Sequence, residues 1–114
     1  MRPLLRLVLA PAIAILFAGC NSSSETIASC QLGADTCYDY PNNADSQLTL
    51  QACVGPGSVN GQYAPYSCTG VNLVGTCANV PGQAIIGTLI RYYSPTYTAT
   101  TAALACALAD GTLE

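Results

Sequence analysis

The residues most able to do chemistry in this chain of 114 residues are its seven cysteines. Six of them follow residue 29, at Cys30, Cys37, Cys53, Cys68, Cys77 and Cys106. No two have the close spacing of a zinc site, and the chain has no histidine to complete one. Cysteine at this density is typical of exported proteins with a disulfide framework. We therefore expect these six to form three disulfides, and we expect no metal site.

Spacing alone does not fix how six cysteines pair. If each helix packs on the strand that precedes it, disulfides between Cys37 and Cys53 and between Cys77 and Cys106 are favoured. This pairing leaves Cys30 to bond to Cys68. If each half of the domain holds three cysteines, at least one bond must also join the two halves.

Acid–base catalysis has few candidate residues here. After residue 29 the charged side chains are only Asp35, Asp39, Asp45, Arg91, Asp110 and Glu114. General acid–base catalysis at neutral pH usually draws on histidine or on a carboxyl or amine with a shifted pKa. Nothing in the sequence pairs two carboxylates across a scissile bond, and the aspartates lack the spacing of an EF-hand loop. We expect no enzymatic activity and no cofactor.

The tyrosines are a better indication of binding. They are the only aromatic residues after residue 19, and a tyrosine ring offers a large contact area with a hydroxyl that tolerates water. We expect Arg91, Tyr92, Tyr93 and Tyr97 to form a surface for a protein or a glycan. The alternative is that the rings edge the core and that Arg91 pairs with an aspartate. A chain without lysine excludes a basic nucleic-acid surface.

Residues 1–19 predict an export signal. Arg2 and Arg6 precede an apolar run at residues 7–17, which is too short to span a bilayer as a helix. The string at residues 16–20, Leu-Phe-Ala-Gly-Cys, resembles the bacterial lipobox. That resemblance implies cleavage before Cys20 and fatty acylation of its sulfur and amine. The alternatives are an ordinary secretory signal cleaved after Ala18 and an uncleaved membrane helix.

Two or three acyl chains hold a protein stably on a membrane, whereas one does not. The lipobox resemblance therefore implies a lipid anchor at Cys20 in the bacterial cell envelope. Asn21 stands after the cysteine where an aspartate would retain the protein, which implies sorting to the outer membrane. We expect a polar tether over residues 20–29 and a disulfide-stapled domain over residues 30–114.

The domain has few large side chains for a core. The 95 residues from position 20 include 17 isoleucines, leucines and valines, and no phenylalanine, tryptophan or methionine. A core of this size is marginal without crosslinks. The domain also contains an apparent duplication, with units at residues 30–67 and 68–114. Thr36-Cys37 matches Thr76-Cys77, and 13 positions separate both Tyr40 from Cys53 and Tyr93 from Cys106.

In both units the last cysteine is followed by a glycine and a bulky residue, Gly61 with Tyr63 and Gly111 with Leu113. Each unit is expected to contain a strand followed by a helix, which predicts a small disulfide-rich α+β domain. The strand is predicted at residues 84–93 with neighbours on both sides, because both of its faces are apolar.

The small-residue periodicity of residues 98–109 predicts a helix capped by Gly111, and a shorter helix is predicted at residues 45–53 with Asn43 or Asp45 as N-cap. Asn60-Gly61 is typical of a tight hairpin turn.

These features predict a lipid-anchored, exported cysteine-rich module with a binding or structural role. The part after the signal loosely resembles uncharacterised cysteine-rich bacterial lipoproteins that share strings such as Gly75-Thr76-Cys77 and residues 91–95, Arg-Tyr-Tyr-Ser-Pro. That resemblance implies no particular activity. The alternative is a small exported inhibitor that acts through a rigid loop between crosslinks, such as residues 53–68.

Overall fold

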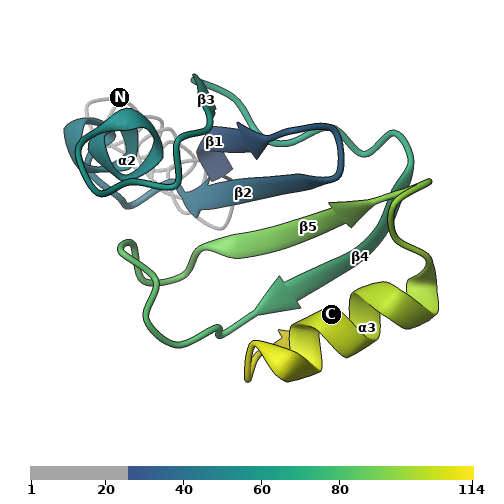
Figure 1. Ribbon diagram of the computed structural model, residues 1–114. Coiled ribbons are helices and arrows are strands. Elements are labelled where there is room, and N and C mark those ends of the chain that lie inside the picture. The colour runs from purple at the N-terminus through teal and green to yellow at the C-terminus, as the bar shows by residue number, and fades with distance from the viewer. Residues whose placement is uncertain (1–25) are drawn as a thin grey trace, which may run out of the picture.

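The computed structural model describes residues 26–114, which form a six-stranded antiparallel sheet with two helices (Figure 1). The signal segment and Cys20 lie outside the described residues. The elements in chain order are β1 (Thr26–Leu32), β2 (Thr36–Pro41), α2 (Ser46–Val54), β3 (Gln62–Ala64), β4 (Leu73–Ala78), β5 (Leu89–Tyr93), α3 (Ala99–Leu108) and β6 (Thr112–Leu113). The predicted small disulfide-rich α+β fold is confirmed, although sheet dominates it.

The sheet has the strand order β3-β1-β2-β5-β4-β6. Each half of the chain therefore runs strand, strand, helix, strand, and the halves meet where β2 pairs with β5. The central strand β5 has a neighbour on both sides, as its two apolar faces predict.

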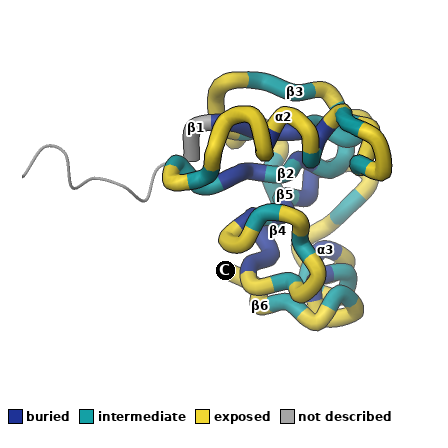
Figure 2. The backbone as a smooth tube through the Cα atoms, turned by 90° about the vertical axis from the view of Figure 1, so that its left-hand side faces the viewer, coloured by how far each residue is buried: buried dark blue, intermediate teal, exposed yellow. Residues whose placement is uncertain are grey.

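One row of paired residues crosses the four central strands. Cys30 pairs with Tyr38, Tyr38 with Ile90, and Ile90 with Cys77, so all four side chains point to the same face of the sheet. Cys30 is bonded to Cys53 of α2, and Cys77 is bonded to Cys106 of α3. Both helices consequently cover this one face. Buried residues follow the strands, while exposed residues gather on the helices and connections (Figure 2).

The third disulfide joins Cys37 of β2 to Cys68 on the opposite face. The predicted Cys77–Cys106 bond is confirmed, but the Cys37–Cys53 and Cys30–Cys68 predictions are wrong. Successive strand residues alternate between faces, so Cys37 points away from α2 because its neighbour Tyr38 points toward it. The Cys37–Cys68 bond does link the two halves, as three cysteines in each half require.

The two halves correspond in detail, in a different alignment from the one that the sequence predicts. Cys30, and not Cys37, is the equivalent of Cys77. Cys30 lies on β1, the middle strand of the first half, and Cys77 lies on β4, the middle strand of the second. Each of these two cysteines forms a disulfide to the helix of its own half. Gly61 and Gly111 also occupy equivalent positions, each directly against the disulfide of its own half.

The helices match their predictions closely. Asp45 caps α2 by accepting hydrogen bonds from the Gln47 and Leu48 amides at 2.8 and 3.3 Å. Thr98 caps α3 in a capping box with Thr101. The residue with left-handed backbone after α3 is Asp110, and not Gly111 as the predicted cap would require. The amide of Gly111 still donates a hydrogen bond to the Cys106 carbonyl at 3.0 Å.

Three other predictions need correction. The strand predicted at residues 84–93 begins only at Leu89, because residues 84–88 form turns held by bonds from Thr88 to the Ile85 carbonyl. Asn60-Gly61 lies between a helix and a strand, so it makes no hairpin, although Asn60 is left-handed with φ 58°. Finally, β1 begins at Thr26, so the last four residues of the predicted tether at 20–29 belong to the sheet.

The close approach of Gly61 and Gly111 to the disulfides predicts the effect of adding one methyl group. A Cβ at Gly61 would overlap Cys30 Sγ and lie 2.9 Å from the Gln31 carbonyl oxygen, and a Cβ at Gly111 would overlap Cys77 Sγ. We expect Gly61→Ala and Gly111→Ala each to cost roughly 1–3 kcal/mol, measured by chemical denaturation, because the packed surroundings must shift.

Gly70→Ala is the matched control, since a Cβ there meets nothing within 4 Å. Equal stability of all three variants would contradict the close packing of glycine on the disulfides.

Candidate functional site

The best-formed hollow on the described domain is a groove on the helix-covered face, which we name the Tyr38 groove. It has a volume of about 460 Å³, within the range of small-ligand sites. Tyr38 and Tyr40 of β2 line it on the sheet side. The remaining lining residues belong to α2, to the connection from α2 to β3 and to the connection from β4 to β5. The lining residues are Tyr38, Tyr40, Leu48, Gln51, Ala52, Pro56, Gly57, Ser58, Val59, Gly82, Gln83, Ala84 and Ile85.

The groove exists because the two halves of the fold differ at one place. In the first half, a turn at residues 33–35 joins β1 to β2. In the second half, the equivalent connection from β4 to β5 runs over residues 79–88, and its residues 82–85 reach the groove. Ile85 packs against the core cluster under α2, which fixes this connection as one wall. The longer connection of the second half is therefore what encloses the site.

Tyr38 and Tyr40 occupy a desolvated position at the centre of the domain. Tyr38 contacts the core clusters of both halves, and Tyr40 is only 2% exposed. Burial raises the pKa of the Tyr38 hydroxyl. Burial, together with the neighbouring Tyr38 and Tyr63, raises the pKa of Tyr40 to about 12. Both hydroxyls consequently stay neutral at physiological pH.

The groove has no charged lining residue. Leu48 is 55% exposed, and Val59 and Ala84 are also exposed, so the walls present aliphatic surface to solvent. Gln51 and Gln83 also line the groove, so their carboxamides could exchange hydrogen bonds with a ligand. A groove of this composition suits an uncharged, partly apolar ligand.

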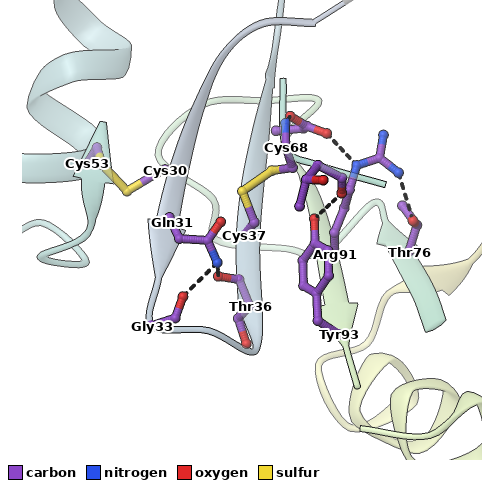
Figure 3. Close-up of a disulfide and its surroundings, with 12 residues drawn as sticks. Cys30, Gln31, Gly33, Thr36, Cys37, Cys53, Cys68, Thr76, Arg91 and Tyr93 are labelled. Carbon is purple, nitrogen blue, oxygen red and sulfur yellow. Dashed lines mark hydrogen bonds and ion pairs between the residues drawn. A yellow bond between two sulfur atoms is a disulfide. The ribbon is translucent and has the colours of Figure 1, made fainter. Parts of the chain in front are cut away.

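A second hollow of about 630 Å³ lies along β1 and β3. One of its polar lining residues, Gln31, is engaged within the domain. The Gln31 carboxamide donates hydrogen bonds to the carbonyls of Gly33 at 2.6 Å and Thr36 at 3.1 Å, which ties it to the turn between β1 and β2 (Figure 3). We therefore regard the Tyr38 groove as the candidate site, although it is the smaller of the two.

The sequence-predicted binding residues do not come together on one surface. Tyr92 and Tyr93 are buried, at 6% and 3% exposure, and successive strand positions place them on opposite faces of the sheet. Tyr97 packs against Tyr92 with ring centroids 4.8 Å apart. Burial is also the main cause that raises the pKa of Tyr92 and Tyr93. These rings contribute to the core, which was the alternative interpretation.

Arg91 forms a structural ion pair. Its Nε donates to the fully buried carboxylate of Asp39, and its Nη1 donates to Thr76 Oγ1 at 2.9 Å. The other Asp39 oxygen accepts from the Cys68 amide at 2.7 Å. Figure 3 shows the Cys37–Cys68 disulfide beside Arg91, Thr76 and Tyr93. Arg91 is thus an aspartate partner beneath the segment that carries Cys68.

The residues of the Tyr38 groove were missed at the sequence level. Tyr38 and Tyr40 alternate along a short strand, which is a visible pattern, but residues 82–85 lie more than forty positions away along the chain. Nothing in the sequence indicates that a connection in the second half packs on the helix of the first. The proposed inhibitory loop at residues 53–68 is also not a free loop, because β3 within it pairs with β1.

Metal and membrane features are limited within the described part of the chain. Residues 26–114 contain no cluster of three His, Cys, Asp or Glu side chains that could hold a metal ion. No helix among those residues is long and apolar enough to cross a bilayer. The three disulfides indicate an exported protein. Comparison with protein-family models, curated proteins and solved structures found no match to the chain.

The raised pKa of Tyr40 predicts an alkaline loss of stability. A tyrosine in the unfolded chain ionises near the ordinary pKa of 10.0, whereas folded Tyr40 keeps its proton until about 12. The unfolded state therefore binds fewer protons in this window, and the free energy of unfolding falls as pH rises. We expect Tyr40 to contribute a loss of about 1 kcal/mol between pH 10 and 11, measured by chemical denaturation.

Tyr40→Phe is the control, because it removes the hydroxyl and keeps the ring. Its unfolding free energy should fall less steeply over the same interval. An identical slope for both proteins would show that the Tyr40 hydroxyl is not desolvated.

Proposed function

We propose that the protein is an exported lipoprotein of the bacterial cell envelope whose domain binds an uncharged partner in the Tyr38 groove. The three disulfides support export. The lipobox-like string at residues 16–20 supports a lipid anchor at Cys20, and Asn21 supports placement in the outer membrane. The observation that carries the binding role is the groove itself, with exposed aliphatic walls, two carboxamide side chains and no charged lining residue.

The groove favours an apolar segment of a partner protein over a glycan. Glycan recognition commonly uses an exposed aromatic face, but the Tyr40 ring is buried and Tyr38 is only partly accessible. The accessible surface comes from Leu48, Val59 and Ala84, which suit an aliphatic side chain. The neutral lining also avoids desolvating a charge when such a segment binds.

Intact-mass spectrometry of the protein from its native envelope tests the anchor. We expect a chain that begins at Cys20 and carries fatty acyl groups, with a mass gain of six hydrogens on reduction because three disulfides open. A mature chain without acyl groups would refute the lipoprotein assignment.

Binding of N-phenyl-1-naphthylamine, a neutral apolar dye, tests the groove. We expect saturable binding by the purified protein, and we expect Ala84→Trp to abolish it because the indole would fill the groove from an exposed position. Ala34→Trp is the matched control, since Ala34 is an exposed alanine in the turn between β1 and β2. Equal dye binding by the two variants would exclude the Tyr38 groove as the site.

A further inference from the structure

The connection between β4 and β5 presents an unusually exposed isoleucine. Ile86 is 92% exposed, the highest value among the exposed large hydrophobic residues of the described chain. The turn that carries it is ordered, because Thr88 donates two hydrogen bonds to the Ile85 carbonyl, from its amide at 3.3 Å and its hydroxyl at 2.7 Å. Ile85 packs inward while Ile86 points to solvent. The fold thus holds this apolar side chain outside the core.

This connection lies at the end of the sheet where the described chain begins. Thr26 of β1 pairs with Pro41 of β2. A methyl group built on Gly87 would lie 3.3 Å from the Pro41 ring, so Gly87 packs directly on that proline. Pro41 thus contacts Gly87 on one side and pairs with the first residue of β1 on the other. Ile86, which precedes Gly87, therefore lies close to the start of β1. Figure 1 shows the β4–β5 connection at the same end of the domain as the start of β1.

The proposed anchor would hold this same end against the membrane. Thr26 lies six positions after Cys20, and a fully extended chain covers at most about 3.6 Å per residue. The tether is then no longer than about 20 Å, roughly the length of β1 itself. An acyl anchor at Cys20 therefore joins the domain at its Ile86 end, and this end reaches the lipid without the tether running back along β1.

The charge of this end selects the kind of contact. The connection at residues 79–88 contains no charged residue, so inserting its tip desolvates no ion. Acidic residues lie close to this connection: Asp45 comes four positions after Pro41, on which Gly87 packs, and Asp110 precedes Gly111, where a Cβ would lie 2.8 Å from Val80. Acidic neighbours disfavour anionic lipid, so the contact is apolar rather than electrostatic.

We propose that Ile86 inserts into the surface of a neutral phospholipid bilayer and forms a second membrane contact beside the lipid anchor. The proposal rests on the proposed function, because the anchor at Cys20 brings the loop to the membrane. One inserted side chain would not hold a protein on a membrane alone. Beside an anchor, it fixes which way the domain faces.

Tryptophan fluorescence in the full acylated protein tests this contact. The chain contains no tryptophan, so Ile86→Trp introduces a single fluorophore. On vesicles of phosphatidylcholine with brominated acyl chains, we expect its emission to shift to shorter wavelength and to lose most of its intensity. Val71→Trp is the matched control, because Val71 is 69% exposed and precedes Leu73, which pairs with Tyr93 at the opposite end of β5.

The outcomes separate the two proposals. Intact mass of the same sample reports acylation, and flotation with the vesicles reports anchoring. Acylated protein that floats with the vesicles but leaves Ile86→Trp as bright as Val71→Trp would overturn the second contact and keep the lipoprotein assignment. Protein that lacks acyl groups and shows no quenching would overturn both. Quenching of Ile86→Trp alone, in acylated protein, supports both proposals.

Discussion

The fold depends on using disulfides as core material. Among residues 28–114, whose burial is described, five of the twelve buried hydrophobic residues are cysteines, and Ile90 is the only one with an aliphatic side chain larger than alanine. The rest of the buried hydrophobic set is alanine and tyrosine. Each half must therefore fasten its helix to its sheet covalently, through Cys30–Cys53 and Cys77–Cys106. The glycines at positions 61 and 111 follow from this arrangement, since only a residue without a Cβ fits beside the sulfurs.

The candidate site arises from a departure from internal symmetry. Tyr38 of β2 and Ile90 of β5 lie side by side at the centre of the sheet, on equivalent strands of the two halves. Each half could therefore in principle have formed the same surface. The connection after β4 is longer than the one after β1, and it extends toward the helix of the other half. The arrangement of strands, helix and disulfide that both halves share thus supplies stability, while the unequal connection forms a wall of the groove.

Local features of the fold were predictable, whereas long-range ones were not. Capping at Asp45 and Thr98 depends on side chains a few residues apart, and both helices were predicted nearly to the residue. Disulfide pairing depends on which strand face each cysteine occupies, and a shift of one residue reverses that face. Cys37 was therefore assigned to the wrong partner. The surface predicted at Tyr92 and Tyr93 does not form for a related reason, because α3 and the segment around Thr69 bury these two rings.

The outer strands of the sheet have a consequence for self-association. β3 has three residues and β6 has two, so each outermost strand offers only a short row of main-chain groups. An incoming strand from another molecule would find too short a template to extend the ladder. The outermost strands are therefore poor templates for edge-to-edge polymerisation when many copies of the domain crowd one surface.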